Sequence, residues 1–312
     1  MRARVVFLAT ALLFCFANAH GDGGLIPFQP KVKVFEPNQN ALIAWDGQEE
    51  ILILSTDTHA SVPTKALEVI PMRSEPAVKE ADPEIFAKAQ RLIDENRLRQ
   101  DPPAMPAGPP GAGPPTMGAP PAGKVTLHER IGRHDIAVTH VLSASGFNSW
   151  AEDYLRSQGA DTPTIPPRIS KAVQGYLDKG FRWFVYDVVE LGASVRTNEP
   201  IQFRFKSDCV FYPLAITQTE SPKVKVRILL ITPKYLTEYP ELPRDHIRVG
   251  LEEAPGASSI AQETVILGQR DLLDLGPDID SLFDHREGMK LRIWTLLPEL
   301  MRGRFTHDLV AR

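Results

Sequence analysis

Three strand-type segments, all within residues 181–233, constrain the fold more than any other part of this chain. The first reads FRWFVYDVVEL, and the next two, IQFRFK and KVKVRILLITP, alternate apolar with polar residues. Such alternation, rich in Val, Ile, Phe and Tyr, is typical of half-buried β-strands. Because Glu220-Ser221-Pro222 reads as a turn, we expect a β-meander whose apolar face is covered by the rest of the chain.

An Asp-Gly pair indicates a further strand pair nearer the N-terminus. Asp46-Gly47 separates two strand-type runs, Ala41–Trp45 and Gln48–Leu54, and both positions of such a connection tolerate a positive φ. We therefore expect a β-hairpin. Since Ile51–Leu54 is apolar on both faces, this hairpin should lie in the interior, and Thr64–Pro71 reads as another strand.

Start and stop signals predict a few amphipathic helices. Asp82-Pro83-Glu84 combines an N-cap residue, a proline at the first helical position and an acidic residue in the first turn. Apolar residues then repeat at helical spacing to about Arg99, which predicts a helix packed on a sheet. Further helices are expected at Phe147–Ser157 and Pro167–Lys179, each followed by a glycine, and Asp271–Phe283 reads as partly helical.

The remaining apolar runs are strand candidates, and together with the helices they define the fold class. These candidates are Lys124–Glu129, Asp135–Leu142, His246–Glu252, Glu263–Leu267, Lys290–Leu297 and Phe305–Val310. Strand-rich stretches with a few helices between them predict an α+β fold of mostly antiparallel β-sheets with a few packed amphipathic helices, interrupted by a Pro/Gly-rich disordered loop.

The first nineteen residues have the three parts of a secretory signal peptide. Arg2 and Arg4 give a positive start, Val5–Phe16 is an apolar run, and Ala17-Asn18-Ala19 is a small-x-small cleavage site. The apolar run is too short to span a bilayer comfortably. We therefore predict export, with cleavage near Ala19, to the periplasm or the extracellular space.

Residues 102–123 differ in composition from the rest of the chain. They contain nine prolines, five glycines and five alanines and carry no charge, so they cannot bury a core and should be a disordered linker. The linker separates residues 20–101, which hold the hairpin and a helix, from the main α+β part, residues 124–312. We expect one body interrupted by this loop, with two domains as the alternative.

Charge and cysteine content narrow the classes of partner. Cleavage after Ala19 removes two arginines, so the net charge of the mature chain is 33 − 39 = −6, and Cys209 becomes its single cysteine. An acidic chain without a basic cluster is not expected to bind nucleic acid. No later run of eighteen apolar residues occurs, so no stable membrane insertion is expected after cleavage. Binding to an unknown protein or to a partner in the cell envelope stays an open alternative.

Two stretches resemble a bacterial family known as domain of unknown function 2330. The first is EPNQNALIAWDGQEEILIL with the later EVIPMRSEP, and the second is FKSDCVFYPLAIT followed by VRILLITP. The similarity extends from about Leu25 to about Val310 and implies a shared fold and an exported protein of unassigned activity. Some members have several cysteines near the mature N-terminus, whereas this chain has none there. The resemblance transfers no functional residue.

Cys209 is a weak candidate for a catalytic thiol. A nucleophilic cysteine needs a lowered pKa, which a nearby histidine or helix N-terminus provides. The sequence around Cys209 carries no signature of a thiol enzyme. We interpret it as a buried, inert cysteine among Phe205, Phe211 and Tyr212.

His128, His134 and His140 recur every six residues and are weak candidates for metal ligands. Successive members on one strand would lie about 20 Å apart, too far for one metal ion. The chain contains neither H-E-x-x-H nor C-x-x-C, no P-loop and no G-x-G-x-x-G after a strand. We therefore expect no metal, no cofactor and no catalytic residue that the sequence can identify.

The aromatic residues of the first strand of the central region have two interpretations. Trp183, Phe184 and Tyr186 could line a ligand cleft, but aromatic residues on a central strand more often belong to the core. We predict an exported protein with a non-catalytic binding or envelope-associated structural role. The alternative is a secreted hydrolase with a thiol site at Cys209 or a pair of carboxylates.

Overall fold

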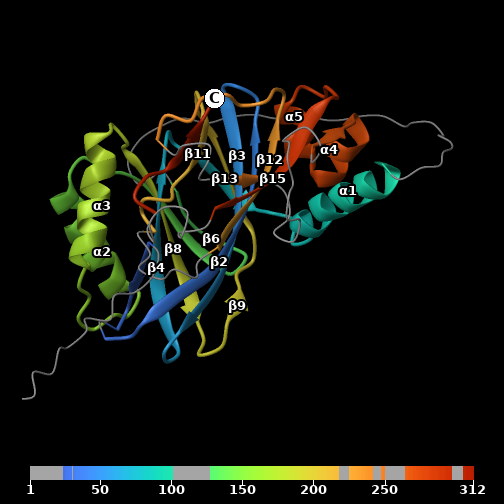
Figure 1. Cartoon of the computed structure of the whole chain (residues 1–312). Coiled ribbons are helices and arrows are strands. Elements are labelled where there is room, and N and C mark those ends of the chain that lie inside the picture. Colours follow the sequence, from blue (N-terminus) through green and yellow to red (C-terminus); the bar gives the residue numbers. More distant parts are fainter. Residues whose placement is uncertain are drawn as a thin grey trace, which may run out of the picture.

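Two β-sheets packed face to face form the centre of the structure, and helices cover the outer face of each sheet (Figure 1). The structure is a computed structural model that describes residues 24–29, 31–100, 127–217, 225–241, 247–249, 264–296 and 305–312. The predicted signal peptide and the linker at 102–123 lie outside these residues. The helices are α1 (Ile85–Gln100), α2 (Ala144–Ser157), α3 (Pro167–Asp178), α4 (Gln269–Leu275) and α5 (Pro277–Leu282). No described helix is long and apolar enough to cross a membrane.

The first sheet has five described strands, all antiparallel, in the order β1-β4-β8-β7-β6. The strands are β1 (Leu25–Pro27), β4 (Thr64–Met72), β6 (Leu127–Ile131), β7 (His134–His140) and β8 (Trp183–Leu191). β4 and β8 pair along their whole lengths, from Thr64 opposite Leu191 to Met72 opposite Trp183. A strand that precedes the linker therefore lies beside one that follows it.

The second sheet has nine described strands, with the main order β13-β15-β12-β2-β3-β10-β5. Its strands are β2 (Val34–Trp45), β3 (Glu49–Ala60), β5 (Ala77–Glu80), β9 (Arg196–Thr197), β10 (Ile201–Lys206), β12 (Lys225–Thr232), β13 (Ile247–Val249), β14 (Val265–Leu267) and β15 (Met289–Leu296). β2 and β12 are parallel, and the other pairs are antiparallel. A separate ribbon pairs β11 (Val210–Tyr212) with β16 (Leu309–Ala311). The prediction of an α+β fold with mostly antiparallel sheets is confirmed.

The N-terminal hairpin forms the middle of the nine-stranded sheet. β2 and β3 pair from Ala41 opposite Leu54 to Trp45 opposite Glu50, so the predicted interior hairpin is confirmed. The turn itself is one residue later than expected, because the N–H of Asp46 donates to the carbonyl oxygen of Glu49 at 3.2 Å. The Asp46 carboxylate accepts the N–H groups of Gln48 and Glu49. Gly47 adopts the positive φ of +111° that this turn requires.

The predicted β-meander is wrong. β8 belongs to the five-stranded sheet, whereas β10 lies between β3 and β5, and β12 lies between β15 and β2. Local alternation identifies a strand but not its neighbours, and here the N-terminal hairpin is inserted between β10 and β12. The expected turn at Glu220-Ser221-Pro222 lies outside the described residues.

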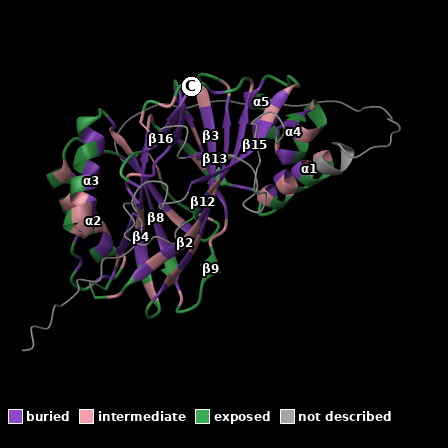
Figure 2. Ribbon diagram, in the orientation of Figure 1, coloured by how far each residue is buried: buried purple, intermediate pink, exposed green. Residues whose placement is uncertain are grey.

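Side chains fill three apolar layers. α2 and α3 cover one face of the five-stranded sheet, the two sheets bury their inner faces against each other, and α1, α4 and α5 cover the nine-stranded sheet (Figure 1). Figure 2 shows the strands buried over most of their length, with exposed residues on the outer sides of the helices and in loops.

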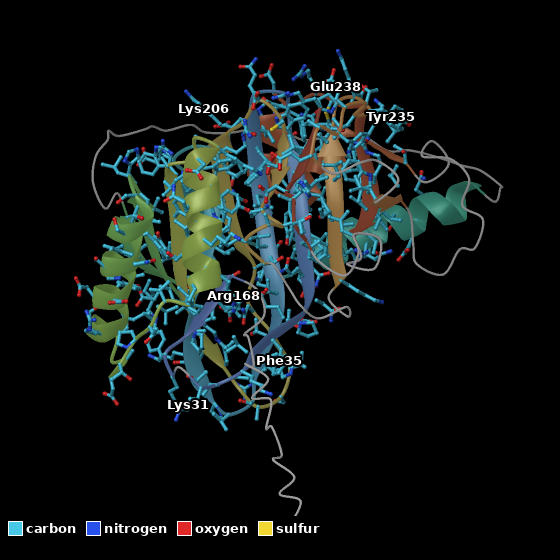
Figure 3. The ribbon with its side chains drawn as sticks, turned by 60° about the vertical axis from the view of Figure 1, so that its left-hand side comes forward. Lys31, Phe35, Arg168, Lys206, Tyr235 and Glu238 are labelled. Atoms are coloured by element: carbon cyan, nitrogen blue, oxygen red, sulfur yellow. The ribbon has the colours of Figure 1, made fainter. Side chains whose placement is uncertain are left out.

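Figure 3 shows Lys31 and Phe35 at one end of this sandwich and Lys206, Tyr235 and Glu238 at the other.

Candidate functional site

A pocket with a volume of about 410 Å³ lies between β7 of the five-stranded sheet and the first turns of α2. This volume is within the range of small-molecule sites. We call it the β7–α2 pocket. Its lining residues are Thr139, His140, Val141, Leu142, Ser143, Gly146, Phe147, Trp150 and Tyr186.

The local sequence explains why a pocket forms at this place. β7 ends at His140, and three residues later Ser143 begins α2 as its N-cap. The Ser143 hydroxyl oxygen accepts the N–H of Gly146 at 3.1 Å, which fixes the direction of the helix as it turns back over the sheet. Phe147 and Trp150 are three residues apart, so both project from the same side of α2.

Aromatic rings form the wall where α2 meets the sheet. The ring centroid of Tyr186, on β8, lies 4.3 Å from that of Trp150 and 5.9 Å from that of Phe147. Trp150 also stacks on Tyr154 at 5.0 Å. Phe147 and Tyr186 are buried, whereas Trp150 is half-buried. The pocket therefore has a rigid aromatic wall with one partly accessible indole.

Two hydroxyl groups on the sheet side of the pocket are buried without a well-formed hydrogen bond. They belong to Tyr186, whose side chain is fully buried, and to Thr139, which is 6% exposed. Burial raises the pKa of Tyr186. The nearby Thr139 hydroxyl lowers this pKa, but its effect is smaller than that of burial. Tyr186 is therefore neutral over the physiological pH range and keeps its proton for donation.

The lining of the β7–α2 pocket carries neither an acidic residue nor a lysine or arginine. His140 is exposed, and its ring lies against Trp183 with centroids 5.0 Å apart. Leu142, which is 76% exposed, is an apolar residue of the lining that faces solvent. The exposed part of the lining thus contains Leu142 beside the polar residues His140 and Ser143, and two buried hydroxyl groups lie in the interior.

A second polar cluster lies between the two sheets. Glu68 on β4 is directly opposite Asp187 on β8, and Asp187 makes a short hydrogen bond with Nδ1 of His134. The Nε2 atom of His134 lies 2.9 Å from the carbonyl oxygen of Glu199. Because side chains alternate along a strand, Asp187 faces away from Tyr186 and from α2.

Burial and mutual repulsion alter the protonation of this cluster. Burial, and then the charge of Asp187, raises the pKa of Glu68 to about 7, although His134 opposes the change. Burial likewise raises the pKa of Asp187. Burial lowers the pKa of His134, but its hydrogen bond and ion pair with Asp187 outweigh burial, and the net pKa is raised. Glu68 therefore exchanges its proton near neutral pH, beside the hydrogen-bonded pair of His134 and Asp187.

The same interior region contains a small cavity of about 20 Å³, large enough for about one water molecule. Glu68 lines it together with Glu36, Gln39 and Tyr212. The Gln39 side chain donates to Glu36 at 2.9 Å and accepts from the Tyr212 hydroxyl at 3.0 Å. This cavity is too small for an organic substrate.

Cys209, the candidate thiol, is fully buried beside Ser207, whose hydroxyl oxygen lies 3.8 Å from the sulfur. Burial raises the pKa of Cys209 to about 11, despite the charge of Arg73. Glu50 is also fully buried, and burial raises the pKa of its carboxyl group well above the usual range. One Glu50 oxygen accepts the N–H of Phe211 at 2.8 Å, and the other has no hydrogen-bond partner among the described residues. An activated thiol is accessible and has a lowered pKa, whereas the Cys209 thiol is buried and has a raised pKa.

The three candidate histidines have different partners. Nε2 of His128 lies 3.0 Å from the carboxylate of Asp135, His134 is held by Asp187, and His140 lines the β7–α2 pocket. Within the described ranges, no group of three His, Cys, Asp or Glu side chains is arranged to hold a metal ion.

Sequence reasoning named Tyr186 as a possible cleft residue but did not find its partners. Phe184 and Tyr186 are buried, as expected of core residues, yet Tyr186 also lines the pocket. Thr139 and Trp150 were missed because they meet Tyr186 only through strand pairing and helix packing. The one sequence signal for this pocket was Thr139, a polar residue near the end of an apolar strand.

Comparisons with known proteins agree with the resemblance seen in the sequence. The model of the family domain of unknown function 2330, described as an uncharacterized protein conserved in bacteria, matches residues 17–247. No curated protein matches the chain. The crystal structure of baculovirus P35 is similar with a TM-score of 0.39 and 8% identity, over 92% of this chain and 99% of that chain. A likeness at this level supports no inference about function.

Proposed function

The chain belongs to the bacterial family domain of unknown function 2330, and we propose that it is an exported, non-catalytic binding protein that takes a small, mainly apolar molecule in the β7–α2 pocket. The observation that carries this proposal is the pocket itself. Its volume of about 410 Å³, its aromatic wall and its two buried hydroxyl groups form the combination typical of small-molecule sites.

Export and the division of the chain are further parts of the proposal. Residues 1–19 have the pattern of a cleaved signal peptide. Residues 20–101 and 124–312 would form one body, with residues 102–123 as a linker. The support for one body is that each large sheet contains strands from both parts: β4 pairs with β8 in one sheet, and β2 and β3 lie between β12 and β10 in the other.

A hydrolase is less well supported. A thiol mechanism needs an accessible thiolate, whereas Cys209 is buried and its pKa is raised to about 11. A carboxylate mechanism needs two neighbouring carboxyl groups, and Glu68 and Asp187 are such a pair. They lie between the sheets, beside a cavity of about 20 Å³. No organic substrate fits there, so binding without catalysis is the function that the geometry favours.

The binding proposal can be tested with a neutral apolar dye, N-phenyl-1-naphthylamine, whose fluorescence increases in an apolar environment. We expect saturable binding at one site. Replacing Trp150 by alanine removes the accessible part of the aromatic wall and should weaken binding at least tenfold, because it removes roughly 1.5 kcal/mol or more of apolar contact.

Phe35→Ala provides the control. Phe35 is also a half-buried aromatic residue on a strand, but it stacks on His59 and does not line the pocket, so its loss should leave dye affinity unchanged. Linear, non-saturable fluorescence, or equal affinities of the two variants, would contradict the proposal.

A further inference from the structure

The hydroxyl groups of Tyr186 and Thr139 line the β7–α2 pocket without a well-formed hydrogen bond to each other or to another described residue, and they indicate the chemical class of its ligand. We propose that the pocket takes a planar, uncharged aromatic molecule with one hydroxyl or similar polar group, which hydrogen-bonds to the hydroxyls of Tyr186 and Thr139. This inference rests on the proposed function and adds to it the polarity, the charge and the shape of the ligand.

The requirement for a polar group follows from burial. The hydroxyls of Tyr186 and Thr139 have both lost water without gaining a well-formed hydrogen bond. A buried polar group without a partner is unfavourable, and a ligand that supplies the partner recovers this loss on binding. A ligand hydroxyl can donate to one of the two groups and accept from the other.

The requirement for planarity follows from the wall. Tyr186 and Phe147 lie nearly parallel, with an angle of 17° between their rings, and Trp150 contacts Tyr186 at a tilt of 40°. Aromatic surfaces interact best with other aromatic rings in offset-stacked or edge-to-face arrangements. A flat ring can therefore cover this wall more completely than a saturated ring of the same size.

The requirement for neutrality follows from the lining. No acidic residue, lysine or arginine lines the pocket, so a buried ion would lack a counter-charge. The N-terminus of α2 would favour an anion, but the N–H of Gly146 is already bound to the Ser143 hydroxyl. A carboxylate ligand is thus the main competing possibility, and the experiment includes one.

Calorimetric titration with four related probes tests each requirement. The probes are 2-naphthol, naphthalene, 2-naphthoate and decahydro-2-naphthol. We expect 2-naphthol to bind about tenfold tighter than naphthalene, because one net hydrogen bond is worth about this factor. The charged 2-naphthoate and the non-planar decahydro-2-naphthol should each bind at least tenfold more weakly than 2-naphthol.

Variants assign the preference to the named hydroxyls. Tyr186→Phe keeps the ring and should reduce 2-naphthol affinity to that of naphthalene, while naphthalene affinity stays the same. Thr139→Val should act in the same direction and serves as the second variant. Tyr154→Phe is the matched control, because the Tyr154 hydroxyl donates to Asp135 at 3.2 Å and its residue does not line the pocket.

The outcomes separate this inference from the proposed function. If naphthalene and 2-naphthol bind equally well, or if Tyr186→Phe lowers both affinities alike, the polar part of the inference is overturned while the binding site stands. Tightest binding of 2-naphthoate would overturn the requirement for neutrality. If none of the four probes binds, the proposed function fails together with the inference.

Discussion

Replacing Glu68 by glutamine should change how the stability of this protein depends on pH. Glu68 lies opposite Asp187 between the two sheets, where burial and the neighbouring charge raise its pKa from 4.5 to about 7. The native state therefore binds a proton that the unfolded chain releases at lower pH. This contribution to stability is complete below pH 4.5 and is lost as the pH rises through about 7.

The magnitude follows from the two pKa values. The interval between 4.5 and about 7 corresponds to about 3 kcal/mol, at about 1.4 kcal/mol for each tenfold change in proton affinity. Glutamine has nearly the same shape and does not ionise. The free energy of unfolding of Glu68→Gln, relative to that of the wild-type protein, should therefore increase by about 3 kcal/mol between pH 4.5 and pH 8.

Urea unfolding followed by tryptophan fluorescence at several pH values measures this difference. Glu190→Gln is the matched control, because Glu190 is an exposed carboxylate on the same pair of strands, opposite Lys65. We expect its curve to run parallel to that of the wild-type protein. If the curve of Glu68→Gln is also parallel to the wild-type curve, Glu68 is ionised in the native state and the reasoning about its burial is wrong.

Four further predictions concern other parts of the chain. Gly175→Ala should stabilise the protein by about 0.5–1 kcal/mol in urea unfolding, because Gly175 is exposed in α3 and an added Cβ meets nothing within 4 Å. Gly47→Ala should instead destabilise it by about 1–2 kcal/mol, since Gly47 has a φ of +111°. The buried Cys209, with a pKa of about 11, should not react with a thiol reagent in the native state and should react fully after unfolding; rapid native labelling would contradict its burial. Mass spectrometry of the exported protein should find His20 as its first residue, and an intact Met1 on the exported product would refute cleavage.

Much of the secondary structure could be predicted because its signals are local. Asp82-Pro83-Glu84 directly precedes α1, and the Asp82 carboxylate accepts the N–H of Glu84 at 2.9 Å, although the helix itself begins at Ile85, later than expected. Gly159 and Gly180 follow α2 and α3 with positive φ values of 96° and 89°. These features depend on the conformational preferences of a few adjacent residues, so the sequence alone identifies them.

The partners of the strands could not be predicted in the same way. The segments that became β10 and β12 alternate clearly and the β8 segment is rich in strand-forming residues, yet the three belong to different sheets or have other strands between them. Any two strands with one apolar face can pair, and the choice depends on how the whole set buries its apolar area. Alternation within a segment contains no information about that choice.

The candidate site shows the same division. The sequence by itself determined that Tyr186 lies on a strand, that Phe147–Ser157 is helical, and that Cys209 lacks the surroundings of a thiol enzyme. Only the tertiary structure brought Thr139, Tyr186 and Trp150 around one pocket, because these residues come from two paired strands and a helix packed across them. Pockets and altered pKa values arise from neighbours distant in sequence, and folding alone sets those distances.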